Sequence, residues 1–147
     1  MISTKAEFRA VRERVGLTQK MLADQLGNTI DMVKKWENPK YSNPPQDAIT
    51  LLENALDSHQ RIVDEAIRHV HATTSLHEGK PQGIDLLYYR SQAQYDKYGR
   101  DVGEYNVVNA RTREIAVRLQ QDGYPVTLHY PEDLDEHLFH TLASTRR

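Results

Sequence analysis

Residues 16–37 read GLTQKMLADQLGNTIDMVKKWE and predict two short helices joined by a turn. Thr18 is a residue type that caps a helix N-terminus. The helix after it places three apolar residues on its inward face: Leu22, Ala23 and Leu26. Ala23 is small enough to let a second helix cross closely. Gly27 tolerates positive φ, so we expect the chain to turn there.

The second helix has an apolar side and a polar side. Asn28 or Thr29 is expected to cap it, and Val33 and Trp36 lie on one face. The rest of the helix surface carries Thr29, Ile30, Asp31, Lys34 and Lys35. In a helix-turn-helix, the outward face near the start of the second helix reads base edges in the DNA major groove. The spacing therefore predicts a DNA-binding element.

The same run resembles the Cro/CI-type repressors, also called XRE-type. Their pattern is roughly T-Q-x-x-L-A-x-x-L-G, four or five variable residues, a hydrophobic residue, two variable residues and W-E. The residues that fit in register are Thr18, Gln19, Leu22, Ala23, Leu26, Gly27, Val33, Trp36 and Glu37. Pro39 departs from the pattern, since the family usually has Gly after the recognition helix. The resemblance implies a lambda-repressor-like helix-turn-helix bundle that binds DNA.

The resemblance also implies roles for individual residues. Base contacts are expected from Thr29, Ile30, Asp31 and Lys35. Phosphate contacts are expected from Thr18, Gln19, Lys34, Asn38 and Lys40. Arg12 and Glu37 occupy positions where this family often has an ion pair that ties the first helix to the end of the recognition helix.

Composition indicates a globular protein. The chain has 147 residues, of which 27% are charged and 38% hydrophobic, enough for one ordinary domain or two small ones. It has no Cys, which excludes disulfides, thiolate zinc sites and Cys nucleophiles. Its apolar runs are too short to span a bilayer, and its first residues lack a secretory apolar core. We therefore expect a cytoplasmic protein.

The charge is divided unevenly along the chain. Residues 1–46 hold eight Lys and Arg against five Asp and Glu, whereas the remainder holds eleven against sixteen. The basic excess lies with the motif, as attraction to phosphates requires. Ordinary surface solvation is the other explanation of this difference.

The elements around the motif follow from periodicity and from turn residues. A first helix is expected from about Thr4 to Gly16, with Phe8, Val11 and Val15 inward. A loop follows the recognition helix over residues 38–45, which contain three Pro. Residues 45–73 predict one or two helices, with a bend near residues 57–59. We expect a DNA-binding domain over residues 1–57, a connecting helix and linker over 58–79, and a dimerisation domain over 80–147.

The C-terminal half predicts a small mixed fold, so the fold class is mainly α with a small α+β part. A linker is expected over 75–83, before the first strand. The expected elements after it are strands over 84–89 and 126–130, helices over 91–98 and 109–121, and a short helix after Pro131 that ends by Leu142. The longer helix places Val108, Thr112, Ile115 and Leu119 on one face, and Gly123 stops it.

Two strands alone are marginal in water, so this half is expected to bury a face against a second copy. The apolar residues available for dimerisation are Val63, Ile67, Val70, Leu86, Tyr88, Val126 and Leu128. The segments 87–89 and 106–108 also resemble the C-terminal part of a family that includes anti-CRISPR-associated repressors and related enterobacterial helix-turn-helix proteins. That resemblance implies a homodimer on an inverted-repeat operator.

These features predict a dimeric transcriptional repressor. Metal binding, catalysis and RNA binding are the alternatives to it. His69, His71 and His77 could suggest a metal site, but the first two lie two apart on a helix and point in different directions. His137 and His140 are three apart and could share a face, but the sequence offers no third ligand, so no metal and no cofactor are expected. The chain shows no phosphate-binding Gly loop and no hydrolase motif, so we expect no enzyme activity. Seven of the eight Tyr follow residue 87 and would suit base stacking in RNA, but packing explains them as well. The alternatives that stay open are a generic helix pair, a motif retained only for protein interaction, an antitoxin and a module that binds RNA or a partner through the Tyr-rich half.

Overall fold

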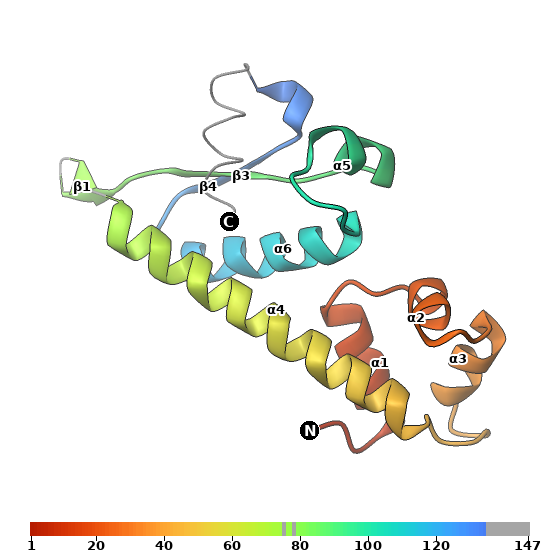
Figure 1. Cartoon of the computed structure of the whole chain (residues 1–147). Helices are drawn as coiled ribbons and strands as arrows, with labels where there is room; N and C mark the ends of the chain where they lie inside the picture. Colours follow the sequence, from red (N-terminus) through yellow and green to blue (C-terminus); the bar gives the residue numbers. More distant parts are fainter. Residues whose placement is uncertain (75, 78, 135–147) are drawn as a thin grey trace. The chain divides into compact units, whose positions relative to one another are not determined.

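The computed structural model describes residues 1–74, 76–77 and 79–134 (Figure 1). The described chain is mainly helical, with six α-helices and a two-stranded parallel sheet in its C-terminal half. It divides into two compact units, Met1–Gln60 and Arg61–Arg147.

Three short helices with threonine caps begin the N-terminal unit: α1 (Lys5–Arg14), α2 (Gln19–Leu26) and α3 (Ile30–Trp36). The hydroxyls of Thr4, Thr18 and Thr29 each accept a hydrogen bond from a backbone N–H in the first turn, at 3.0, 3.0 and 3.2 Å. Each cap satisfies a donor that the helix itself leaves without a partner. Gly27 ends α2 in the left-handed region, with φ 63°. The expected caps and turn are therefore confirmed, and Thr29 rather than Asn28 caps α3.

The core of this unit contains the inward residues that the periodicity indicates. Phe8, Leu22, Val33, Trp36 and Leu52 are buried, whereas Leu26 is half-buried. The rings of Phe8 and Trp36 meet edge to face, with centroids 6.5 Å apart. Such an aromatic pair adds stability beyond the area that it buries. This contact joins α1 to the end of α3.

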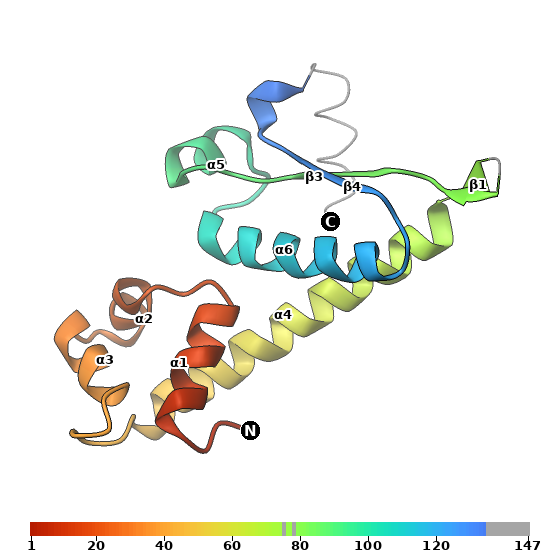
Figure 2. The same ribbon diagram turned by 180° about the vertical axis from the view of Figure 1, so that it is seen from behind.

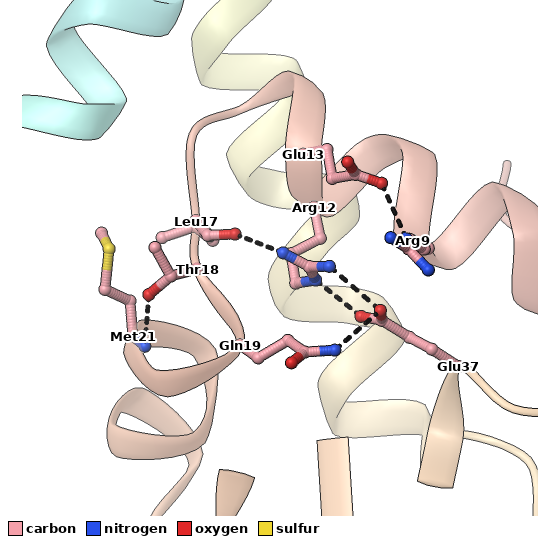
Figure 3. Close-up of polar contacts among 8 residues, drawn as sticks. All are labelled: Arg9, Arg12, Glu13, Leu17, Thr18, Gln19, Met21 and Glu37. Carbon is pink, nitrogen blue, oxygen red and sulfur yellow. Dashed lines mark hydrogen bonds and ion pairs between the residues drawn. The ribbon is translucent and has the colours of Figure 1, made fainter. Parts of the chain in front are cut away.

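A buried ion pair between Arg12 and Glu37 joins the same two helices (Figure 3). Arg12 donates from Nε to Glu37 Oε2 at 2.6 Å, from Nη2 to Glu37 Oε1 at 3.0 Å and from Nη1 to the Leu17 carbonyl at 3.0 Å. Gln19 Nε2 adds a fourth hydrogen bond, to Glu37 Oε1 at 3.2 Å. The two charged side chains are only 9% and 4% exposed. The ion pair implied by the family resemblance is therefore present, and it links α1, α2 and α3.

A single helix, α4 (Gln46–Thr73), follows the loop that contains Pro44 and Pro45. The sequence left open one or two helices with a bend near residues 57–59, and the structure has one continuous helix there. The division between the two units falls inside this helix, after Gln60. Residues of α4 therefore contribute to the core of both units.

The C-terminal unit is built on a parallel pair of strands. β3 (Ile84–Leu87) pairs with β4 (Val126–His129), with Ile84 opposite Val126 and Leu87 opposite His129. Parallel strands need a crossover connection, and here α5 (Gln92–Tyr98) and α6 (Tyr105–Gln121) provide it. α6 lies along the strand pair, as the opposite views in Figure 1 and Figure 2 show.

Several expected bounds in this unit need correction. The expected linker contains an antiparallel pair, β1 (Leu76–His77) and β2 (Lys80–Pro81). The helix expected over 109–121 begins at Tyr105, because Gln92 of α5 accepts a hydrogen bond from the Tyr105 N–H at 3.1 Å and so replaces the missing local cap. A 3-10 turn (Pro131–Asp133) follows β4. The rest of the expected C-terminal helix lies outside the described residues.

Two apolar clusters hold the unit together. One contains Leu87, Tyr89 and Tyr95, and the other contains Val63, Ile67 and Leu119. Val63 and Ile67 were expected at a dimer interface, but they are buried in this cluster of the chain's own α4 and α6 residues. Val70 and Val126 pack against the same cluster and are half-buried. The apolar stripe of α4 is therefore covered within the chain.

Loss of one partner of the buried ion pair should destabilise the N-terminal unit strongly. Glu37→Ala leaves the Arg12 guanidinium buried without its counter-charge, at a cost of about 3–5 kcal/mol of unfolding free energy. The measurement is chemical denaturation of the full chain followed by fluorescence of Trp36, the single Trp of the sequence, which is buried in this unit.

Glu13→Ala is the matched control for this variant. It breaks the Arg9–Glu13 pair on α1, whose side chains are 61% and 56% exposed. Exposed pairs of this kind contribute about 0–1 kcal/mol. An equal loss of stability in the two variants would contradict the role assigned to the buried pair.

Candidate nucleic-acid interface

The outward face of α3 carries the residues expected to contact bases. Thr29, Ile30 and Asp31 are exposed and Lys35 is half-exposed, whereas Val33 and Trp36 on the other face are buried. Ile30 is a large apolar side chain that remains 39% exposed. All four expected base-contact residues are therefore at least partly accessible to solvent, and Asp31 and Lys35 lie one helical turn apart on the same side of the helix.

Lys35 is held by two neighbours on this face. Its ammonium lies 3.2 Å from Asp31 Oδ2, one helical turn away, and 5.7 Å from the centre of the Tyr41 ring. Both contacts attract a cation. They restrict the positions of the Lys35 head group while leaving it accessible to a ligand. A polar ligand on this face meets a carboxylate and an ammonium side by side.

The start of α2 carries two residues expected to contact phosphates, and they lie differently. Thr18 is exposed, and its Oγ1 accepts from the Met21 N–H, so the hydroxyl hydrogen is not used by the cap. Gln19 is half-buried and donates one amide hydrogen to Glu37. The structure thus gives Gln19 a second role, as part of the buried ion-pair network.

The remaining expected phosphate contacts lie at the end of α3 and in the loop after it. Lys34, Asn38 and Lys40 are exposed. The Asn38 side-chain oxygen accepts from the Lys40 N–H at 3.0 Å, which places Pro39 inside a tight turn. This bond stabilises the turn at the position where the family usually has Gly.

Lys20, a further cation near the start of α2, pairs with a carboxylate of the same helix. Its ammonium lies 2.7 Å from Asp24 Oδ2, and this hydrogen bond and the attraction of the carboxylate raise the pKa of Lys20. Its charge is therefore matched locally.

Lys5 is a residue of this region that the sequence analysis did not single out. Its Nζ lies within hydrogen-bonding distance of four backbone carbonyl oxygens, those of Lys35, Asn38, Tyr41 and Ser42, at 3.2, 2.8, 3.0 and 2.6 Å. We call these four oxygens the carbonyl cradle. A sequence signal was available, because a cation in the first turn of a helix opposes the helix dipole and so calls for a partner elsewhere.

Histidines of the C-terminal unit pair with single carboxylates. His71 Nε2 lies 3.0 Å from Asp122 Oδ2, and His129 Nε2 lies 2.8 Å from Asp85 Oδ1. Over residues 1–74, 76–77 and 79–134, no group of three or more His, Asp or Glu is placed to hold a metal ion. Across the same residues, no helix has both the length and the apolar character needed to cross a membrane.

The tyrosines of the C-terminal unit are mostly taken up by packing. Tyr89 and Tyr95 are buried and meet edge to face, with ring centroids 4.8 Å apart. Tyr98 and Tyr105 pack against the same cluster. Few of these rings are free to stack on single-stranded bases, so the structure gives little support to the RNA-binding alternative.

Comparison with known proteins agrees with the geometry of the N-terminal unit. Residues 8–59 match the family model HTH_3, described as helix-turn-helix. None of the curated protein sequences compared with the chain matches it significantly. The match covers less than half of the chain and includes α2, α3 and the Arg12–Glu37 pair. Residues 8–59 are therefore a helix-turn-helix domain of the Cro/CI (XRE) type, a DNA-binding domain of transcriptional regulators.

Proposed function

We propose that the protein is a sequence-specific transcriptional repressor that binds an inverted-repeat operator as a homodimer. The observation that carries the proposal is the outward face of α3. This face presents exposed polar and charged side chains on a helix that the buried Arg12–Glu37 pair fixes against α1. A helix held in this way can enter the major groove without losing its own packing.

Each residue of that face suits a different group on a base edge. Lys35 donates to the O6 and N7 acceptors of guanine, and Asp31 accepts from the amino group of cytosine. Ile30, or the methyl group of Thr29, contacts the methyl group of thymine. Because Asp31 repels phosphates, its carboxylate favours sites where a base offers it a donor and disfavours sites where none is available.

The phosphate contacts fall on the two sides of this face. Thr18 and Gln19 lie at the start of α2, and Lys34, Asn38 and Lys40 lie at the end of α3 and just beyond. Contacts of this kind set the register of the protein on the duplex but carry no sequence information.

A dimer follows from the small number of base pairs that one recognition helix can read. In a twofold dimer, the two half-sites lie about 34 Å apart or a multiple of that distance. Leu128, 45% exposed, and Tyr130 remain accessible on and after β4, and Leu86 and Tyr88 are half-buried. We assign the dimer contact to these four residues, because Val63 and Ile67 are buried within the chain.

Removal of the Lys35 ammonium should relax base preference. Lys35→Ala is expected to lower operator affinity by about 1–3 kcal/mol and to reduce discrimination at one position of each half-site. The operator is first obtained by selection from random duplexes, and the preferences of the variant are then measured on the same library.

Lys34→Ala is the control, because it removes the same charge one residue away. It is expected to weaken all duplexes alike and to leave the base preferences unchanged. Unaltered preferences in Lys35→Ala would contradict the assignment of Lys35 to base contact.

Lys40 should act on the backbone alone. Lys40→Ala is expected to weaken binding to operator and to random DNA by the same factor, and to reduce the slope of log K against log salt by about 1. Arg9→Ala, on the exposed surface of α1, serves as the control whose slope stays at the wild-type value. A slope unchanged by Lys40→Ala would remove Lys40 from the contacts.

The dimer assignment is tested by sedimentation of the full chain at micromolar concentration. Leu128→Asp places a charge in the expected contact and should shift the protein to monomer, with weaker operator binding. Thr127→Asp adds the same charge on the opposite face of β4, because side chains alternate along a strand, and should leave the dimer intact. A monomeric wild-type protein with full operator affinity would rule out the dimer model.

A further inference from the structure

We propose that Lys5 is a positioning residue for DNA binding, acting as a tethered cation that organises the loop over residues 38–42. The inference rests on the proposed function, because this loop carries Asn38 and Lys40, two of the expected phosphate contacts. Lys5 itself is not assigned a contact with DNA, since its ammonium is bound by four backbone carbonyls of the same chain.

The geometry of the carbonyl cradle supports this role. An ammonium has three hydrogens, yet four carbonyl oxygens lie between 2.6 and 3.2 Å from Lys5 Nζ. Four acceptors around three donors indicate that the charge itself, as much as each hydrogen bond, holds the cradle together. Hydrogen bonds from a charged donor to neutral acceptors are stronger than bonds between neutral groups.

The cradle oxygens come from two structural elements. Lys35 belongs to the last turn of α3, where the helix dipole is negative, and its carbonyl also accepts from the Asn38 N–H at 3.1 Å. Asn38, Tyr41 and Ser42 belong to the loop. One ammonium on α1 therefore ties the end of the recognition helix to the loop that follows it.

The loop has few other supports among the described residues. The Tyr41 N–H donates to the Asn38 carbonyl at 3.2 Å, the Lys40 N–H donates to the Asn38 side chain at 3.0 Å, and the Asn38 N–H donates to the Lys35 carbonyl at 3.1 Å. All three bonds involve Asn38, whose carbonyl also accepts from Lys5. Without the ammonium, four carbonyl dipoles would face one another with no positive charge between them. The loop would then lose the arrangement that presents Asn38 and Lys40.

The first experiment compares Lys5→Met with Arg9→Met in the full-length protein. Methionine keeps most of the apolar stem and removes the charge, and Arg9 is an exposed cation of the same helix. In the free protein, Lys5→Met should shift the amide resonances of Asn38, Lys40, Tyr41 and Ser42 and speed hydrogen exchange at Tyr41. The amide of Leu22 in α2 should keep its protection. Operator affinity should fall about tenfold in Lys5→Met and less than about twofold in Arg9→Met.

A second experiment asks whether a free cation can replace the tethered one. Lys5→Ala leaves the cradle open, and K⁺ is close in size to an ammonium and is bound by rings of carbonyl oxygens in other proteins. In KCl, Lys5→Ala should regain part of the loop protection and of the affinity that it lacks in NaCl of equal concentration. Wild type and Arg9→Ala should not distinguish the two salts. A purely structural defect in α1 would not be repaired by K⁺.

The outcomes separate the inference from the function on which it rests. Loop amides unchanged by Lys5→Met would overturn the inference whatever the DNA affinity. Disturbed loop amides with unchanged operator affinity would also overturn it, because the loop would then not matter for binding. A wild-type protein without affinity for any duplex would overturn the proposed function and, with it, the positioning role.

Discussion

The N-terminal unit depends on the buried contact between Arg12 and Glu37. Three short helices of ten, eight and seven residues are too short to be stable by themselves in water. Apolar packing brings them together, but packing alone tolerates small rotations of one helix against another. A bidentate ion pair with further bonds to Leu17 and Gln19 tolerates far less, because any displacement leaves a charge buried without its partner. The pair therefore defines how α3 is held, which is the property that a recognition helix needs.

Polar contacts from the neighbouring helices also hold the end of α3. Glu37 is the C-cap residue of the helix and is bound from α1 and α2, while the last-turn carbonyl of Lys35 is bound by Lys5. Both cations that act here, Arg12 and Lys5, come from α1. The first helix thus fixes both the orientation of the recognition helix and the loop beyond it, although no residue of α1 is expected to contact DNA. Substitutions in α1 can in this way change binding without changing any contact to the nucleic acid.

In the C-terminal unit, the helices stabilise a pair of parallel strands. A two-stranded parallel sheet is rarely stable without helices, because its surfaces need cover. Here α6 provides it, with Leu119 in one cluster and Val108 against the other. Asn109 adds two hydrogen bonds, to the N–H and the carbonyl of Tyr89, and so satisfies backbone groups where the ladder ends. Arg118 and Asp64 join α6 to α4, and the Arg118 hydrogen bond lowers the pKa of the Asp64 carboxyl.

The sequence by itself determined the helix-turn-helix, because the information there is local. Thr18, Gly27 and Thr29 act on backbone groups within a few residues of themselves, and the apolar spacing follows from the helix period. The Arg12–Glu37 pair was found only through family resemblance, since nothing in composition or spacing links two residues that far apart in the chain. The tertiary structure alone decided the carbonyl cradle, the start of α6 at Tyr105 and the burial of Val63 and Ile67. In each case the deciding partner is distant in sequence: the loop after α3 for Lys5, Gln92 for Tyr105, and Leu119 for the stripe on α4. An amphipathic pattern in the sequence indicates that the apolar stripe must be covered. It does not indicate whether the same chain or a second copy covers it.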